Sequence, residues 1–312
     1  MAEHAMYFTD DKARKIYLTK KIVGKVFVYL FLSIFALFML APFIMMVAGS
    51  FINYHSFHMF STTANFEYLG FAGRNWGFDN YAAIFDMNNG NYNFPVYFLN
   101  TFIVAIGSTA VTVVTAVLAG FAFARLEFKG KEALFAILLA TMMIPGEMMV
   151  ITNVITVSVI GWENTFAALI LVHGVSVFYV FYLRQTFQQI PNELYLAAKV
   201  DGVSDLGYLW KVMIPIAMPT ITTIIILSMM GAWNSYVWPN LVARGNWMET
   251  NHSMKLVSNG LRDAFAANDT GESDREAVKI AGSMVISAPL FIVFIAFRKY
   301  IMKGVSRSGI KG

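Results

Sequence analysis

The sequence contains few side chains suited to catalysis or metal binding, and their spacing does not group them. It has no cysteine, which excludes disulfides, thiolate metal sites and thiol nucleophiles. A G-x-x-x-x-G-K-[ST] phosphate loop and an H-E-x-x-H motif are absent, and no Ser–His–Asp set has a defensible spacing. We therefore expect no enzyme activity, no metal site and no cofactor on this chain.

Ionisable side chains are nearly absent from the interior of the long apolar runs, and the two exceptions are Glu147 and His173. Glu147 follows Pro145-Gly146, a pair that interrupts helix hydrogen bonding, so its carboxylate could line a polar path or reach the outer membrane interface. His173 could form a helix–helix hydrogen bond or bind a ligand. Two isolated groups give little support for a proton-coupled carrier, which uses buried relays.

Aromatic and polar side chains alternate in the stretch MMGAWNSYVWPN. Trp233, Tyr236 and Trp238 have flat faces that suit sugar rings, although the same residues could form the aromatic belt at the outer interface. Asn234 needs a hydrogen-bond partner if it lies in lipid. Together with Glu147, three of these residues form our candidate substrate pathway: Trp233, Asn234 and Tyr236.

A second polar stripe lies in the run 98–124, which carries small and hydroxylated residues: Gly107, Ser108, Thr109, Thr112, Thr115 and Gly120. Such a stripe permits either close packing against a neighbouring helix or a polar lining.

The elements that position these residues are predicted to be membrane spans. Apolar residues make up 57% of the 312-residue chain and charged residues only 13%, well below the average of about 25% charged in soluble domains. Charge-poor runs near the ~20 residues that a bilayer requires occur at 26–48, 98–124, 134–154, 166–187, 212–238 and 280–301. We therefore expect an all-α polytopic membrane protein with six transmembrane helices. The first run could be a signal peptide, but its length and the lack of an A-x-A site favour an uncleaved span.

The distribution of Lys and Arg predicts the orientation of these spans. Basic residues gather before the first run, after the second, between the fourth and fifth, and at the C-terminus. The positive-inside rule then places both termini and the loop 188–211 in the cytoplasm. We divide the chain into an N-terminal cytoplasmic segment 1–25, a transmembrane domain 26–301 with outer loops about 49–97 and 239–279, and a cytoplasmic tail 302–312. The aromatic- and Asn-rich loop 49–97 could contact an extracytoplasmic partner or simply cover the bundle.

The cytoplasmic loop has the local signals of a short helix. Pro191 suits the first turn, where Glu193 is favourable at the positive end of the helix dipole, and Gly202 suits the C-terminal cap. Glu193, Ala197 and Asp201 share one face at i, i+4 and i+8, and Ser204 can cap a second helix. Such a low-bulk face suits a partner groove, although an ordinary interfacial connection would have similar signals.

This loop resembles the signature of ABC-importer permeases, E-A-A-x-x-x-G followed by nine residues and I-x-L-P. The chain has Leu196-Ala197-Ala198, then Gly202, then nine residues and Val212-Met213-Ile214-Pro215. The resemblance covers most of the chain and is closest to the MalG-like permeases of carbohydrate importers. The further matching stretches are FDNYAAIF (78–85), LAGFAFARLEFKGK (118–131), WNSYVWP (233–239) and KGVSRSGIKG (303–312).

The resemblance implies that segment 191–202 is a coupling helix seated in a cleft of an ATPase subunit. Ala197, Ala198 and Gly202 would make the close approach, and Asp201 would fix the turn. Leu196 replaces the Glu of the family pattern, so either Glu193 supplies the missing carboxylate or the contact at this position is apolar. The tail that reaches toward the ATPase dimer in this subfamily corresponds to Ser306, Ser308, Gly309, Lys311 and Gly312.

The resemblance also implies the partners and the mechanism. The chain would work by alternating access in a bacterial-type cytoplasmic (inner) membrane, importing a sugar or oligosaccharide. Its partners would be lipid, a homologous second permease, two ATPase subunits that hold ATP and Mg, and an extracytoplasmic solute-binding protein, with no nucleic acid. The alternatives are an importer permease for another solute, such as a polyol phosphate, and an ATP-independent secondary carrier.

Overall fold

The computed structural model describes residues 11–52, 76–85, 93–243, 254–266 and 276–306, and this part of the chain is almost entirely helical. The only extended pairing there is an isolated antiparallel bridge between Ile52 and Trp76. The tail residues Ser308, Gly309, Lys311 and Gly312, and most of the outer loop 49–97, lie outside the described residues.

The helices are α1 (Asp11–Phe51), α3 (Asp79–Phe85), α4 (Phe94–Arg125), α5 (Lys131–Thr141), α6 (Gly146–Val159), α7 (Phe166–Leu171), α8 (Val177–Gln188), α9 (Asn192–Val200), α10 (Asp205–Tyr208), the π-helical η3 (Leu209–Met213), α11 (Ile214–Trp233), α12 (Val237–Val242), α14 (Val257–Ala266) and α15 (Glu276–Ser306).

Four helical stretches of the described residues are long and apolar enough to cross a membrane: Tyr17–Phe51, Phe94–Arg125, Asp205–Trp233 and Val278–Arg298. Helices α5 and α6 meet at an angle of 93°, and they add a fifth span if together they form one broken span. The prediction of a polytopic all-helical membrane protein is therefore confirmed at this level.

The run 166–187, predicted as one span, consists of the short helices α7 and α8. The break between them contains Gly174, which lies close to α4. A Cβ at Gly174 would lie 2.5 Å from Cγ1 of Val111, and the Gly174 carbonyl accepts a hydrogen bond from Thr115 Oγ1 at 3.2 Å. Ser176 then starts α8, because its hydroxyl accepts from the Tyr179 amide. Close contact with α4 therefore accompanies the interruption of this run.

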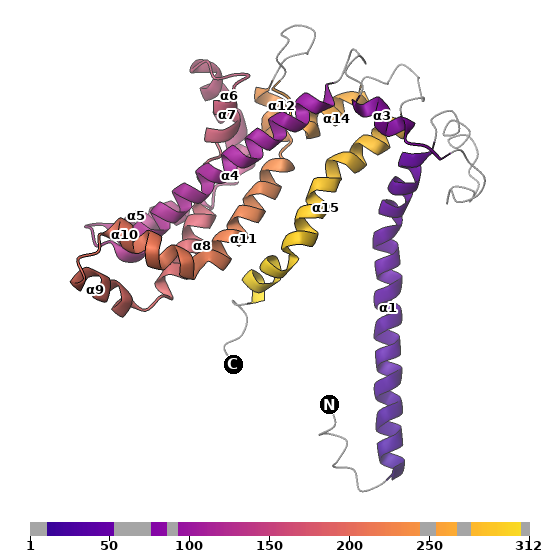
Figure 1. Ribbon diagram of the computed structural model, residues 1–312, viewed down its shortest axis with the longest axis horizontal. Coiled ribbons are helices and arrows are strands. Elements are labelled where there is room, and N and C mark those ends of the chain that lie inside the picture. The colour runs from indigo at the N-terminus through magenta and orange to yellow at the C-terminus, as the bar shows by residue number, and fades with distance from the viewer. Residues whose placement is uncertain (1–10, 53–75, 86–92, 244–253, 267–275, 307–312) are drawn as a thin grey trace.

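The main core lies among α4, α8 and α11 (Figure 1). Its fully buried members include Ala116, Leu183, Phe187 and Ile224. The contact between α4 and α8 depends on Gly120, where an added Cβ would lie 3.0 Å from Leu183 Cβ and 3.3 Å from the Arg184 amide nitrogen. These three helices form the frame that positions the sites described below.

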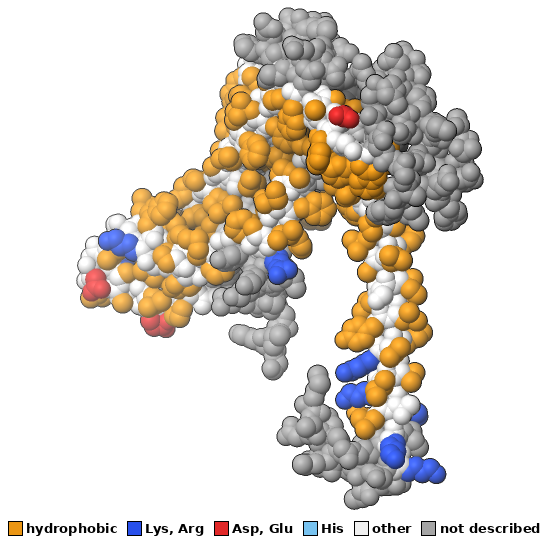
Figure 2. All heavy atoms as spheres, turned by 45° about the vertical axis from the view of Figure 1, so that its right-hand side comes forward, with side chains coloured by type: hydrophobic (Ala, Val, Ile, Leu, Met, Phe, Trp, Pro, Cys, Tyr) orange, Lys and Arg blue, Asp and Glu red, His pale blue; other side chains and the backbone are white. Residues whose placement is uncertain are grey.

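Helix α1 stands apart from this core and approaches the rest of the chain only near its C-terminal end (Figure 1). There Phe43 meets Phe291 of α15 edge to face, and Asn80 of α3 donates hydrogen bonds to the carbonyls of Ser50 and Ile52. Most of α1 is exposed and apolar, with Lys and Arg gathered toward its N-terminal end (Figure 2). The remaining surface of α1 therefore has to be covered by lipid or by another subunit.

Candidate coupling surface and internal cavity

Helix α9 has the boundaries that its local signals predict. Pro191 precedes it in an extended conformation, Glu193 lies in its first turn, and Gly202 follows it at a φ of 73°. This left-handed conformation is accessible to Gly at little cost. Ser204 then caps α10 by accepting a hydrogen bond from the Gly207 amide at 3.2 Å. The segment is thus a separate short helix between two firm turns.

The polar side chains on the inner side of this corner are paired within the chain. Tyr195 Oη donates to Asp205 Oδ1 at 2.7 Å, and Lys199 Nζ lies 2.7 Å from the same oxygen. The hydrogen bond from Lys199, joined by that from Tyr195, lowers the pKa of Asp205 below its ordinary value, and the same bond to Asp205 raises the pKa of Lys199. Burial, followed by the hydrogen bond to Asp205, raises the pKa of Tyr195. These pairs fix α9 to α10.

The outer surface of α9 is apolar where the family pattern has a Glu. Leu196 is 56% exposed and Val200 is 88% exposed, and the two lie one turn apart. Glu193, Ala197, Asp201 and Gly202 are also exposed, whereas Ala198 is half-buried and packs against the main core. The exposed surface of α9 therefore combines one apolar strip with small residues and the carboxylates of Glu193 and Asp201.

Arg125, the last residue of α4, holds the start of α9 in place. Its guanidinium donates to the carbonyl of Phe187 at 2.8 Å and to the carbonyl of Ile190, and it approaches Asn192 Oδ1 at 3.5 Å. Two of these acceptors are carbonyls at the C-terminal end of α8, where the helix dipole also stabilises a positive charge. Apart from its positive charge, Arg125 has no local sequence signal that predicts these contacts.

Arg184 makes a second set of contacts near the same end of the bundle. It is 8% exposed, and its guanidinium carbon lies 4.0 Å from the centre of the Phe135 ring. It donates to both carboxylate oxygens of Glu132 at 3.0 Å and, through Nε, to the Phe123 carbonyl at 3.2 Å. A single buried side chain thereby joins α8 to α4 and α5.

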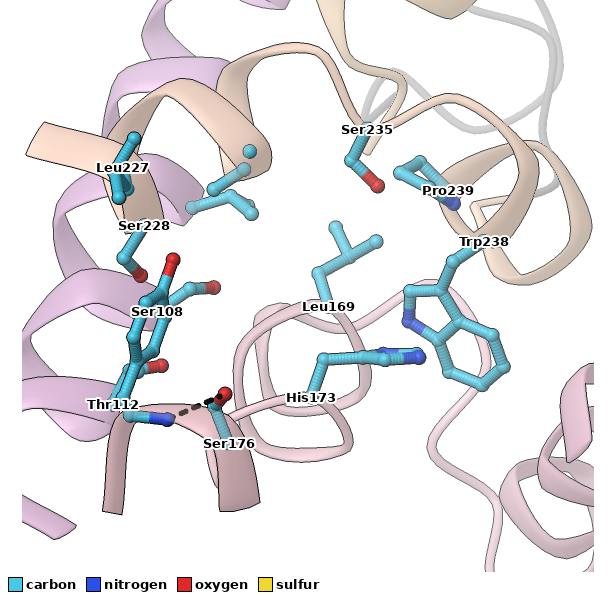
Figure 3. A pocket seen from close by; sticks show the side chains of 14 residues that line it. Ser108, Thr112, Leu169, His173, Ser176, Leu227, Ser228, Ser235, Trp238 and Pro239 are labelled. Carbon is cyan, nitrogen blue, oxygen red and sulfur yellow. Dashed lines mark hydrogen bonds between the residues drawn. The ribbon is translucent and has the colours of Figure 1, made fainter. Parts of the chain in front are cut away.

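A cavity of about 300 Å³ lies deeper in the bundle, lined by residues of α4, α7, α8, α11, α12 and the loops between them. Ser108, Thr112 and Ser228 lie on one side of the space, and Leu169, His173 and Trp238 lie on the other (Figure 3). Hydroxyl groups make up much of its polar lining. The lining residues are Val104, Ser108, Thr112, Leu169, His173, Ser176, Tyr179, Leu227, Ser228, Gly231, Ala232, Ser235, Trp238 and Pro239.

The four predicted pathway residues lie outside this lining. Trp233 is buried and donates its indole N–H to the Ile286 carbonyl at 3.1 Å, and Asn234 is exposed and donates to the Met230 carbonyl at 3.0 Å. The Tyr236 hydroxyl is buried without a hydrogen-bond partner among the described residues. Glu147 is exposed in the first turn of α6.

The polar stripe of the run 98–124 supplies two lining residues of the cavity, Ser108 and Thr112, and the aromatic stretch supplies Trp238. The sequence features that lie in the cavity are therefore the hydroxyl spacing in α4, His173 and Trp238.

The chain belongs to the family described as "Binding-protein-dependent transport system inner membrane component", which it matches over residues 112–307. It is thus a multi-pass inner-membrane component of a transport system. It is 28% identical to the arabinooligosaccharides transport system permease AraQ of Bacillus subtilis, over 75% of this chain and 79% of that protein. It is also 28% identical to the lactose transport system permease LacG of Rhizobium radiobacter, over 73% of this chain and 78% of that protein.

A solved structure shares the fold. It is described as a bacterial ABC transporter involved in the import of the acidic polysaccharide alginate, and the similarity has a TM-score of 0.75. The match covers 90% of this chain and 97% of that chain at 22% identity. This likeness supports the arrangement of helices described above.

Proposed function

We propose that this chain is one membrane subunit of an ATP-driven importer of a sugar or oligosaccharide, and that it couples to an ATPase through segment 191–202. The observation that carries the proposal is the surface of α9, a short helix whose Tyr195 and Lys199 are paired with Asp205. Its exposed side carries an apolar strip and small residues beside the carboxylates of Glu193 and Asp201. Such a face suits insertion into a groove of a partner protein. The relatives AraQ and LacG support a carbohydrate as the substrate.

A second permease subunit is part of this proposal. The apolar surface of α1 is uncovered over most of its length, and a homologous chain packed against it would complete the translocation pathway. The N-terminal end of α1, the C-terminal end of α15 and α9 all lie toward one side of the bundle (Figure 1). We assign this side to the cytoplasm, where two ATPase subunits would hold ATP and Mg, and the opposite side to a solute-binding protein. The tail that ends at Gly312 would also contact the ATPase.

The mechanism that follows is alternating access. ATP and substrate must favour different states of the complex, because a ligand with equal affinity for both states shifts nothing. Closure of the ATPase dimer would move α9, and the ion pair between Lys199 and Asp205 would carry this movement to α10 and on to α11.

The test is a substitution at Gly202 in the complete complex, reconstituted in vesicles with the ATPase, the second permease and the loaded binding protein. Gly202→Val places a β-branched residue at a positive φ, which is strained, so the end of α9 has to shift. We expect assembly to persist and uptake per ATP hydrolysed to fall at least tenfold. Gly202→Asn is the matched control, because Asn tolerates this conformation. Normal coupled uptake by the Val variant contradicts the coupling role of α9.

A further inference from the structure

Two hydroxyl groups that border the cavity have no hydrogen-bond partner among the described residues. Ser108 and Thr112 lie one turn apart on α4, are 8% and 3% exposed, and both line the cavity. Among the described residues, no group hydrogen-bonds to either side-chain oxygen, and the hydroxyl of Ser228 on the facing helix α11 also has none. A hydroxyl inside a membrane span is stabilised by a hydrogen-bond partner. Because Ser108 and Thr112 border the cavity, water or a ligand there can supply one.

The opposite wall is largely aromatic and aliphatic, with His173 as a polar member. The indole N–H of Trp238 donates to the Ala168 carbonyl at 3.1 Å, which fixes the plane of the ring, and His173 meets this ring edge to face at 4.9 Å. Leu169 lies beside them (Figure 3). A molecule in the cavity would therefore meet hydroxyls on one side and an aromatic and aliphatic surface on the other.

The charge of the lining distinguishes among ligand classes. Among the described residues, no Asp, Glu, Lys or Arg lines the cavity. A phosphate or a carboxylate brought into this space would meet no Lys or Arg, and the one imidazole of the lining, that of His173, packs against the Trp238 ring. Burial of an unpaired charge is costly. The volume of about 300 Å³ lies at the lower end of the range of about 300–1,000 Å³ for small-molecule sites. The cavity therefore suits a small, uncharged, hydroxyl-rich molecule.

We propose that this cavity is a subsite for one neutral sugar unit, in which Ser108, Thr112 and Ser228 exchange hydrogen bonds with sugar hydroxyls and the apolar wall beside Trp238 receives the ring. The proposal rests on the proposed function, because a translocation pathway is what gives a sugar access to this depth. It goes further in selecting neutral sugars over uronates and sugar phosphates. It also gives this subunit a direct role in substrate contact, at residues other than the four predicted from the sequence.

The first experiment deletes the hydroxyls at nearly constant shape. The double variant Ser108→Ala/Thr112→Val is assembled in the complete importer and trapped with ATP and vanadate, and binding of radiolabelled lactose and arabinobiose is measured. We expect the affinity to fall about tenfold, which corresponds to about 1.4 kcal/mol. Thr109→Val is the matched control. Thr109 lies on the same helix, and its buried hydroxyl has no hydrogen-bond partner among the described residues, but it does not line the cavity.

The second experiment fills the cavity without disturbing the packing. Gly231 lines the cavity, and an added Cβ there would meet no atom within 4 Å. Gly231→Leu should therefore fold and assemble normally, while uptake of the neutral sugars falls at least tenfold. A complex of normal yield and normal thermal stability shows that the loss arises in the pathway.

The outcomes separate the subsite from the proposed function. If both variants bind and import the neutral sugars as the parent protein does, while uptake still requires ATP and the binding protein, the subsite is overturned and the importer assignment stands. If the parent complex imports digalacturonate or glycerol 3-phosphate but no neutral sugar, the charge argument is overturned. Uptake by the parent protein without ATP or a binding protein overturns the proposed function itself.

Discussion

The corner formed by α9 and α10 and the cavity use polar groups in opposite ways. At the corner Tyr195, Lys199 and Asp205 are paired with one another, and the exposed side of α9 carries an apolar strip and small residues beside two carboxylates. In the cavity the hydroxyls of Ser108 and Thr112 have no protein partner among the described residues. Paired polar groups fix the shape of a surface that a protein partner can bind. Unpaired polar groups can instead form hydrogen bonds with water or with a small polar ligand.

One helix joins the two regions. The stretch from Asp205 to Trp233 is a continuous helical segment, which includes the π-helical turn Leu209–Met213. Asp205 at its start holds α9, and Leu227, Ser228 and Gly231 near its other end line the cavity. A displacement of α9 would therefore reach the cavity wall through one continuous helical segment, and π-helical turns of this kind often occur at functional sites.

The largest effect is expected from Leu196→Glu, which restores the carboxylate of the family pattern. If the partner groove is apolar at this position, the variant buries an unpaired carboxylate at a cost of about 2 kcal/mol or more, and uptake should fall about thirtyfold. Leu196→Met is the control and should retain uptake within twofold. The measurement is ATP-dependent sugar uptake in vesicles. Unchanged uptake by the Glu variant would mean that the ATPase keeps a basic partner, and Glu193→Gln would then become the damaging change.

A smaller effect is expected from Arg125→Met, which leaves α9 intact but removes its anchor to α4. The variant loses the charged hydrogen bonds to the carbonyls of Phe187 and Ile190, which are each worth about 1.5–3 kcal/mol. We expect uptake to fall about tenfold while binding of the neutral sugar to the trapped complex is retained. Uptake by Arg125→Lys should lie between that of the parent protein and that of Arg125→Met. Equal loss of sugar binding and uptake would contradict the separation of the two regions.

The two regions also differ in how far the sequence predicted them. The boundaries of α9 depend on local signals, Pro191 before the helix, Gly202 after it and Ser204 at the next cap, and these were recognisable without a structure. The cavity is built from residues between Val104 and Pro239 that converge only after the helices pack. The spacing of Ser108 and Thr112 fitted either close helix packing or a polar lining, and only the position of the neighbouring helices decides between them.

Contacts between distant residues were beyond sequence reasoning for the same physical reason. Arg184 and Glu132 are 52 residues apart, so neither the ion pair nor the Phe135 contact has a local pattern. The run 166–187 has the apolar composition of one span, and composition does not report the close approach of Gly174 to α4. The prediction therefore gave the correct class of protein and the short helix between Pro191 and Gly202, but not the break between α7 and α8.

The ion pair at the corner has a defined pH dependence. The pKa of Asp205 is lowered by Lys199 and Tyr195, so its stabilisation is present above the ordinary carboxylate pKa and is lost as the pH falls below about 4. The pKa of Lys199 is raised, so its part is lost only as the pH rises above about 10.5. The difference in unfolding temperature between the parent protein and Asp205→Asn should therefore be constant from pH 5 to 9 and shrink below pH 4. Asp201→Asn is the control, and a difference that changes between pH 6 and 8 would contradict this assignment.

The smallest effect is expected at Glu147, which belongs to neither region. Its side chain is exposed in the first turn of α6, next to the 93° bend between α5 and α6, and it does not line the cavity. If it contributes to the pathway, it does so from the bend, so Glu147→Ala should lower uptake two- to threefold without changing assembly or sugar binding to the trapped complex. Glu163→Ala is the control for loss of an exposed carboxylate, and this variant also removes the hydrogen bond that Ser158 donates to Glu163. Unchanged kinetics would make Glu147 a residue of the membrane interface, and a loss as large as that of Gly231→Leu would extend the pathway from the cavity to α6.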